Sequence, residues 1–331
     1  MKRLSISLAL LFVIGLTGCQ SSEYHDIGDV HRDVSAASSE AQLWFDRGLA
    51  MTYGFNHEEA IICFDRALAI SPDCAMAHWG RAYALGPNYN APILTDDASH
   101  QAFESMQRAV ATSRSASPVE QALIQALQAR YSWPAPADRS ELDRRFADEM
   151  RKVHARFPDD AGVCAATAEA LMQLRPWKLW SPEGKPAPEL AEIRRVLEGG
   201  LKRWPDHPAL CHLYIHAMEA GPEVALAVPA ARRLEPLTPG LGHLVHMPSH
   251  IYVWTGQYDD VIRVNLKACE VDDAYVQERG KNNFYTAYRI HNYHFVAYGA
   301  MWEGRRELAL RFAKAIPGEI DPELLSAFPE V

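Results

Sequence analysis

A pattern of small and bulky residues that recurs about every 34 positions is the feature that most constrains this chain of 331 residues. Its order is a bulky residue, a small one, two small residues around a phenylalanine, and a proline. The clearest copy consists of Trp44, Gly48, Ala60, Phe64, Ala67 and Pro72. Small residues let two antiparallel helices approach, bulky residues fill the space between them, and proline ends the second helix. The pattern therefore predicts stacked pairs of antiparallel helices.

The pattern recurs with varying clarity along the chain. Looser helix pairs are expected at 119–131 with 141–157, and at 162–174 with 189–204. No stretch shows strand-like alternation of useful length, so the predicted fold is all-α, an α-solenoid of antiparallel helix pairs with a concave groove. The clearest copies cover residues 41–74, 75–118, 208–241, 242–275 and 290–323.

The order of small, bulky and proline residues resembles the tetratricopeptide repeat (TPR), a helical hairpin of 34 residues. The resemblance implies that residues 40–331 form one TPR-like helical repeat domain. An insertion containing Gly86-Pro87-Asn88-Tyr89-Asn90 separates the two helices of the second copy. We interpret its Asn88-Tyr89-Asn90 segment as a structural turn, with a lid over a site as the alternative.

The start of the chain is predicted to be a targeting signal rather than part of the fold. Lys2 and Arg3 precede an apolar run that ends at Leu16. A basic start, a short apolar stretch and small residues before a cleavage site are typical of secretory signals. The run is too short for a stable transmembrane helix. We therefore expect residues 1–18 to be removed on export.

The segment Leu16-Thr17-Gly18-Cys19 resembles the bacterial lipobox. The resemblance implies that the chain is cleaved before Cys19, that Cys19 is lipidated, and that residues 19–39 are a polar tether. The residue after the cysteine is Gln20, which in the same resemblance favours the outer membrane, facing the periplasm. The alternative is an ordinary signal peptide with an incidental cysteine.

Composition excludes several classes of protein. A hydrophobic content of 48% and a charged content of 23% exclude bulk disorder, a collagen-like fibre and a multi-span membrane protein. The net charge of −9 provides no global basic field for nucleic acid. The five cysteines beyond Cys19 are odd in number and widely spaced, without a CxxC motif, so we interpret them as buried apolar residues rather than disulfides or zinc ligands.

Histidines gather at helical spacing in three short segments, CHLYIHAME, GHLVHMPSH and IHNYH. Separations of three and four residues place side chains on one face of a helix. Each segment is expected to lie in the first helix of its repeat, although Pro248 in the second segment is unusual inside a helix and predicts a kink or a later helix start. The candidate metal ligands are His212, His216, Glu219, His243, His246, His250, His291 and His294.

The three segments also follow the repeat length. His212 and His246 are 34 residues apart, and the same separation holds from His216 to His250. The third segment follows the second by 48 residues, which is one repeat plus a 14-residue insertion around 272–283. Neighbouring helices pack with their axes about 8–10 Å apart, and the TPR resemblance places these positions on the concave groove. We therefore expect the imidazoles to meet there.

Seven imidazoles and one carboxylate in one groove are expected to hold neutral rings, because repulsion and desolvation oppose their protonation. Neutral imidazoles beside a carboxylate are ligands for a divalent transition metal such as zinc, iron or manganese. Eight candidates exceed the four ligands of a structural zinc site, so one open site and two metals both remain open. A polar groove that binds no metal is the alternative.

These observations favour a cell-envelope TPR-repeat lipoprotein with a histidine-rich metal site in the groove. Whether the site is catalytic stays open at this point; if it is, a metalloenzyme of hydrolytic or oxidative type with unknown substrate fits it. GFNHEEA, MAHWGRAYALGPNYN, HLYIHAMEAG and GHLVHMPSHIYVWTGQYDDV together resemble a largely uncharacterised subgroup of bacterial TPR lipoproteins, and the likeness implies no reaction. The alternative is a non-enzymatic scaffold that binds a peptide or an envelope protein in the groove. The membrane is expected to be contacted through the lipid anchor alone, and no nucleic-acid partner is expected.

Overall fold

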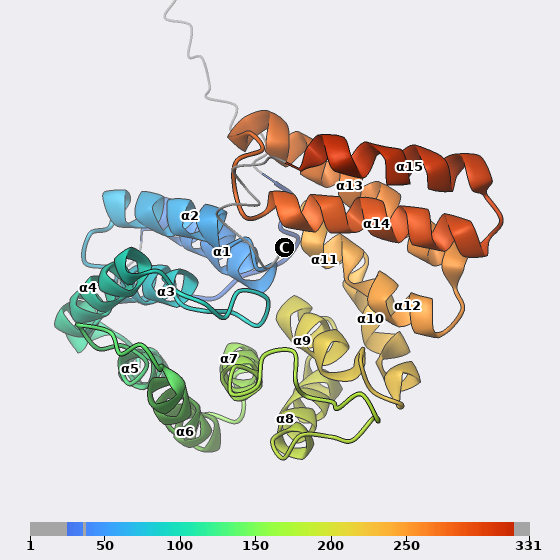
Figure 1. Ribbon diagram of the computed structural model, residues 1–331. Helices are drawn as coiled ribbons and strands as arrows, with labels where there is room; N and C mark the ends of the chain where they lie inside the picture. The colour runs from blue at the N-terminus through green and yellow to red at the C-terminus, as the bar shows by residue number, and fades with distance from the viewer. Residues whose placement is uncertain (1–24, 36–37, 321–331) are drawn as a thin grey trace, which may run out of the picture.

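The computed structural model describes residues 25–35 and 38–320. Within these ranges the regular secondary structure is helical, apart from one isolated bridge between Trp180 and Pro186. Helix pairs follow one another around the molecule (Figure 1), so the predicted all-α solenoid is confirmed. The expected signal peptide and Cys19 lie outside the described residues. Within the described part of the chain, every helix falls short of the length or the apolar character needed to cross a membrane.

The first half of the solenoid contains four helix pairs, and both looser pairs expected from the sequence are among them. One short 3-10 helix, η1 (Ser113–Ser115), follows the second pair. The pairs are α1 (Ser39–Tyr53) with α2 (His57–Ile70), α3 (Ala75–Leu85) with α4 (Asp96–Thr112), α5 (Pro118–Gln128) with α6 (Ser140–Arg156), and α7 (Ala161–Met172) with α8 (Leu190–Arg203).

The second half carries the histidine segments. Its elements are α9 (Pro208–Met218), η2 (Val224–Ala227), α10 (Val228–Leu234), α11 (Gly242–His246), α12 (Pro248–Trp254), α13 (Tyr258–Arg279), α14 (Thr286–Trp302) and α15 (Arg306–Glu319). The helix expected across GHLVHMPSH is divided, since Met247 ends α11 and Pro248 begins α12. Proline is well tolerated there because the first turn of a helix needs no N–H donor. The expected insertion around 272–283 lengthens α13 to 22 residues and forms the turn after it.

The repeat pattern acts through close packing of small residues on a phenylalanine. Phe64 on α2 is buried. A Cβ added at Gly48 on α1 would lie 2.7 Å from its ring, and one added at Gly80 on α3 would lie 2.4 Å away. These glycines therefore let α1 and α3 approach α2 from the two sides. The cysteines also behave as predicted, because Cys63, Cys74, Cys164, Cys211 and Cys269 are all free and buried.

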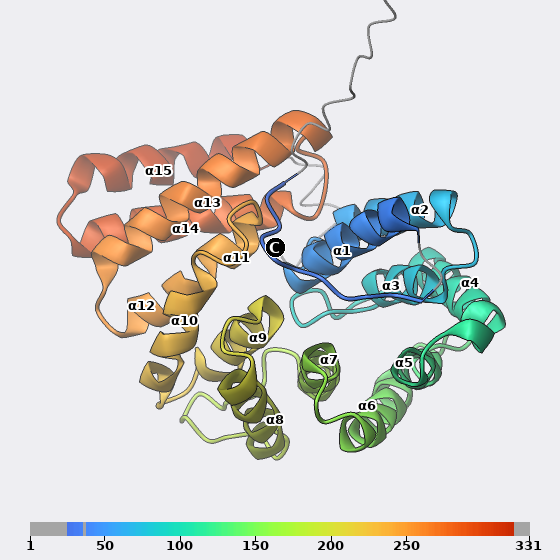
Figure 2. The same ribbon diagram turned by 180° about the vertical axis from the view of Figure 1, so that it is seen from behind.

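The solenoid curves until its first helix pair meets its later helices (Figure 1 and Figure 2). Glu59 on α2 is fully buried. Its two carboxylate oxygens accept hydrogen bonds from Nε and Nη2 of Arg279, at the end of α13, at 2.6 and 2.8 Å. Sequence separation between these residues is 220 positions, so the pair joins opposite ends of the solenoid.

Residues 25–35 belong to the segment expected to be a polar tether, but they lie against the solenoid. Ile27, Val30 and Val34 are partly buried against the hydrophobic core, which gives this short stretch an apolar reason to dock. Arg32 donates two hydrogen bonds to the carboxylate of Asp160, the N-cap residue of α7, at 2.8 and 3.0 Å. This part of the segment is therefore continuous with the folded domain.

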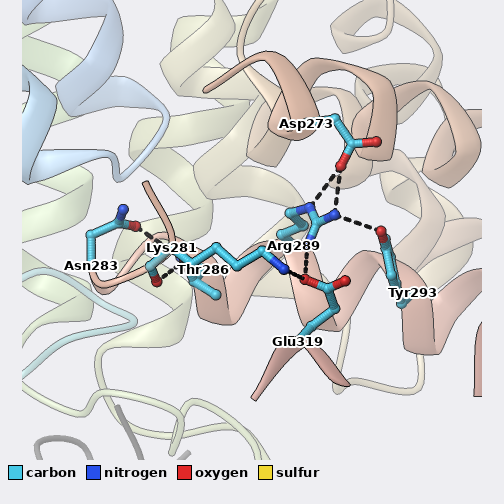
Figure 3. Close-up of polar contacts among 7 residues, drawn as sticks. All are labelled: Asp273, Lys281, Asn283, Thr286, Arg289, Tyr293 and Glu319. Carbon is cyan, nitrogen blue, oxygen red and sulfur yellow. Dashed lines mark hydrogen bonds and ion pairs between the residues drawn. The ribbon is translucent and has the colours of Figure 1, made fainter. Parts of the chain in front are cut away.

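A polar cluster fixes α14 between α13 and α15 (Figure 3). Arg289 on α14 donates to Asp273 on α13 at 2.6 and 2.8 Å and to Glu319 on α15 at 2.5 Å. Its guanidinium also donates to the hydroxyl of Tyr293 at 2.7 Å. Glu319 accepts a second charged donor, Lys281, at 2.6 Å. Three elements are thus tied to one arginine, which lies two residues before His291.

Candidate metal centre

Six histidines meet where the α1–α2 turn, α9, α11, α12 and α14 come together. They form two groups, in each of which one ring nitrogen per residue lies within 4.8 Å of the others. The first trio is His212 and His216 from α9 with His243 from α11. The second trio is His246 from α11, His250 from α12 and His291 from α14. Each trio therefore draws its nitrogens from more than one repeat.

The grouping in space differs from the grouping along the sequence. His243 is grouped with His212 and His216 of α9 rather than with the other histidines of its own segment. Its ring lies toward His212, while the rings of His246 and His250 lie toward α14. His294 belongs to neither trio. It is exposed, and its ring centroid lies 6.1 Å from that of His291. Seven of the eight candidate ligands are therefore brought together, with Glu219 placed between the trios.

In the first trio, hydrogen bonds to one ring nitrogen determine what the other can do. His212 Nδ1 lies 2.7 Å from the carbonyl oxygen of Tyr53, and His216 Nδ1 lies 2.6 Å from Glu219 Oε1. Both oxygens only accept, so each Nδ1 carries the proton and each neutral ring has a lone pair on Nε2. His212 Nε2 is 3.2 Å from His243 Nε2, while His216 Nε2 is buried without a partner.

The second trio shows the same arrangement more strongly. His246 Nδ1 lies 2.6 Å from Asn265 Oδ1, and the amide nitrogen of Asn265 donates to the Val261 carbonyl at 2.8 Å, which fixes the amide. His250 Nδ1 lies 2.5 Å from Glu219 Oε2. Both rings therefore donate from Nδ1, and when neutral they direct lone pairs at each other across 2.8 Å between their Nε2 atoms. A cation at this position would relieve the repulsion.

Glu219 lies between the two trios and uses both of its oxygens. One accepts from His216 of the first trio and the other from His250 of the second. Burial alone would raise the pKa of this carboxyl group, but the neighbouring His250 and His216 outweigh burial and hold it well below its usual range. Glu219 is therefore an ionised acceptor that orients one ring of each trio.

Burial favours the neutral form of the other rings. It lowers the pKa of His212, His243 and His246 well below 6.5, and neighbouring imidazoles add to the effect. The pKa of His291 falls to about 3, first through burial and then through His250. At neutral pH these residues present lone pairs, which is the protonation state that metal binding requires.

Aromatic residues enclose both trios. The ring centroid of Phe55 lies 4.5 Å from that of His212 and 5.8 Å from those of His216 and His243. Phe295 covers the second trio, with its centroid 4.7–4.8 Å from those of the three rings. This shell lowers the local dielectric and restricts solvent, both of which strengthen metal–ligand interactions.

Two residues at the centre have positive φ angles, Phe55 at 54° and Trp177 at 58°. Both contact His216. A non-glycine residue in this conformation is strained and is found most often at functional sites. Among the described residues, the only other such residue is His25. The location of the strain therefore agrees with a functional centre.

The insertion after α3 also covers the first trio. Asn88 accepts the backbone N–H groups of Asn90 and Ala91 at 2.9 and 2.8 Å, which makes the segment a turn closed by a side chain. Tyr89 is buried in this turn, with its ring centroid 5.2 Å from that of His216. The turn interpretation is confirmed, and its tyrosine forms part of the wall around the histidines.

Comparison with known proteins identifies no family for this chain. No family model matches the chain, and no curated protein matches it. Similar solved structures include the human IFIT1 dimer with m7Gppp-AAAA and the same dimer with PPP-AAAA. Both are 13% identical over 83% of this chain, cover 71% and 72% of the other chain, and have TM-scores of 0.40 and 0.39.

Sequence reasoning missed the groups that orient the rings. Asn265 comes from α13, where a lone polar residue on a buried face gives no signal of its partner. The acceptor for His212 is the backbone carbonyl of Tyr53, 159 residues away, and a backbone atom has no signature in a sequence. Phe55 and Phe295 carry no sequence signal that links them to the histidines. These groups became visible only through their contacts with the imidazoles.

Proposed function

We propose that this protein is a metalloprotein that binds divalent transition metal through the two histidine trios. The observation that carries the proposal is the pair of Nε2 atoms of His246 and His250, 2.8 Å apart, each on a ring whose other nitrogen already donates to an acceptor. Two lone pairs at this distance repel unless a cation lies between them. Metal-ligating histidines generally donate their second nitrogen to a carboxylate, carbonyl or water, and four of the six histidines make such a contact to a carboxylate, a side-chain amide oxygen or a backbone carbonyl.

The spacing of the nitrogens also fits a metal ion. Two imidazole nitrogens bound to one tetrahedral ion at about 2.0–2.1 Å lie about 3.3–3.4 Å apart. His212 and His243 already present their Nε2 atoms at 3.2 Å, and the Nε2 atoms of His246 and His250, at 2.8 Å, need to separate by about half an ångström. Imidazole donors suit zinc, copper, iron and nickel better than manganese. This ligand set therefore favours zinc or iron over manganese among the metals considered from the sequence.

An ion bound by three protein nitrogens keeps an open coordination position. In such a position a metal polarises a substrate or activates water, which fits a hydrolytic or an oxidative metalloenzyme. In this proposal Glu219, Asn265 and the Tyr53 carbonyl orient the rings, and the aromatic shell excludes water.

The test is the metal content of protein purified without a histidine tag. Wild-type protein should retain metal through dialysis, whereas His250→Ala should lose it from the second trio. His294→Ala is the matched control, because His294 lies three residues from His291 on the same helix but in neither trio, and this variant should retain the wild-type metal content. Wild-type protein that binds no zinc, iron or copper above background would overturn the proposal.

We also propose that the protein is an exported lipoprotein of the outer membrane. The support is the sequence pattern up to Cys19, since these residues lie outside the described structure. Cys19→Ala should move the protein from the membrane fraction to the soluble periplasmic fraction. Unchanged fractionation of this variant would count against a lipid anchor.

A second candidate function is a scaffold that binds an extended peptide. Its support is a cleft of about 920 Å³ on the first half of the solenoid. The cleft is lined by charges of both signs, among them Asp96, Arg139, Asp143 and Arg175, which suits a polar peptide. A stoichiometric partner that is lost with Arg139→Glu but retained by metal-free protein would favour this function.

A further inference from the structure

We propose that the centre holds two metal ions as a coupled pair that share one solvent-derived hydroxide, with Glu219 as the residue that couples their binding. This inference rests on the proposed function and assigns its number of ions and their mutual arrangement. Glu219 is a positioning residue in this arrangement, since it contacts one ring of each trio rather than an ion.

The first argument for two ions is the number of imidazole nitrogens that a single ion would leave without a partner. A single ion bound by four ligands would leave at least two of the six imidazoles without a partner for their ligating nitrogen. A buried polar atom without a partner costs about 1–3 kcal/mol. One trio to each ion uses all six rings, and it matches the division into two groups of nitrogens that lie within 4.8 Å of one another.

The second argument is the short distance between the trios. Ring centroids within each trio are 4.8–6.1 Å apart. Across the boundary, the centroids of His243 and His246 are 6.0 Å apart, and those of His216 and His250 are 6.3 Å apart. In these two pairs, rings of different trios are almost as close as rings of the same trio. Paired metal ions in proteins lie about 3.5–4 Å apart, and this arrangement brings two ions within reach of one small ligand.

The third argument is charge. Six neutral imidazoles leave the charge of two divalent ions uncompensated, and the nearest anion, Glu219, contributes one negative charge from outside the ligand set. Burying such an excess of positive charge is unfavourable. A metal ion lowers the pKa of bound water to about 7, and two ions act together on a water that both bind. A shared hydroxide is the smallest anion that reduces the excess charge and fills an open position on each ion.

Coupling follows from the hydrogen bonds of Glu219. An ion in the first trio holds the ring of His216, and this ring holds one oxygen of Glu219 at 2.6 Å. The other oxygen of Glu219 lies 2.5 Å from Nδ1 of His250. It thereby orients the ring of His250 toward the second ion. Binding of one ion therefore prepares a ligand of the other, and thermodynamic reciprocity makes the effect equal in both directions.

The experiment uses copper(II) as the probe, because its unpaired electron reports the distance and bridging of neighbouring ions. Metal-free full-length protein is titrated with copper(II), the bound copper is counted, and the spin is integrated by electron paramagnetic resonance. Wild-type protein should bind two copper ions per chain and show far less than two spins, because a hydroxide bridge pairs the two electrons. His291→Ala should bind one copper with one full spin, and His294→Ala should match the wild type.

The possible outcomes separate the two proposals. No bound copper or zinc in the wild type overturns the proposed function itself. One bound ion per chain leaves the proposed function standing and overturns the pair. Two ions with two full spins overturn the shared hydroxide. Circular dichroism and thermal unfolding of each variant show that the changes do not come from failure to fold.

The requirement that Glu219 supports both trios is tested with single-site backgrounds. His291→Ala leaves only the first trio complete, and His216→Ala leaves only the second. Adding Glu219→Gln should lower the affinity for the remaining ion about 10–100-fold in both backgrounds, which is the usual effect of removing a group that orients a ligand. Asn265→Ala should do so only in the His216→Ala background, since Asn265 contacts only His246 among the ligands. A Glu219→Gln effect confined to one background would overturn its coupling role.

Discussion

Replacing Asp272 with asparagine should stabilise the protein relative to the wild type by an amount that grows as the pH rises from 5 to 7. Asp272 on α13 is fully buried, and its Oδ2 accepts a hydrogen bond from the amide of Asn292 at 2.6 Å. Burial raises the pKa of its carboxyl group to about 8, although Tyr285, Arg289 and Asn292 partly oppose the shift. Asparagine has the same shape and can accept the same bond, but it has no proton to lose.

The sign follows from proton uptake. The unfolded chain loses the Asp272 proton near the ordinary value of 3.8, whereas the folded protein keeps it until about pH 8. Between these values the folded state binds more protons, so its stability falls as the pH rises by about 1.4 kcal/mol for each pH unit. From pH 5 to pH 7 the wild type should therefore lose about 2.5 kcal/mol that Asp272→Asn retains.

The assay is urea unfolding of both proteins in metal-free buffer at several pH values. The two proteins should differ little at pH 5, where the folded carboxyl group is neutral, and the variant should gain the stated advantage by pH 7. Glu270→Gln, an exposed carboxylate on the same helix, is the control, and its difference from wild type should stay constant. A difference between Asp272→Asn and wild type that does not change with pH would refute the reasoning.

Three further predictions concern packing, closure and the metal. Gly80→Ala places a methyl group against the Phe64 ring and should lower the free energy of unfolding in urea by about 1–3 kcal/mol. Gly199→Ala, whose added Cβ would have nothing within 4 Å, should be neutral or stabilising. Equal effects of the two changes would contradict the packing role of Gly80. Arg279→Met leaves the buried Glu59 carboxylate without its charged partner and should lower the free energy of unfolding by about 3 kcal/mol. A decrease below about 0.5 kcal/mol would show that the pair does not hold α2 and α13 together. Removing metal that was present at about 100 times its dissociation constant should lower stability by about 2.7 kcal/mol for each ion removed, as measured by thermal unfolding, with no such loss in a variant that lacks both trios.

The helical architecture could be predicted because it depends on local pattern. Gly48 and Phe64 occupy fixed positions of the repeat pattern, and their roles follow from how close two helices must approach. The break at Pro248 was also indicated by the sequence, since proline inside a helix must kink it or begin a new one. Each of these features is determined by residues within one or two repeats.

The division of the histidines into trios could not be predicted in the same way. Equal spacing along the chain places His212 and His246 at equivalent repeat positions, but the structure pairs His212 with His243, at 3.2 Å. His243 and His246 both lie on α11 yet belong to different trios, whereas His246 and His250, on either side of the break at Met247, belong to the same trio. Repeat register therefore indicates which residues approach the interior, but neither the register nor the helix boundary indicates which rings meet.

Closure of the solenoid supplies what no single repeat contains. The first trio needs the Tyr53 carbonyl from the first helix pair to hold His212, and Phe55 from the same turn packs on all three of its rings. Both residues reach α9 because the chain curves back, and the Glu59–Arg279 pair stabilises that curvature. An open solenoid with the same sequence would still carry the six histidines, but His212 would lose its acceptor and the first trio its apolar cover. Weakening the closure should therefore lower metal affinity at the first trio more than at the second, whose ligands and acceptor Asn265 all come from α11 to α14.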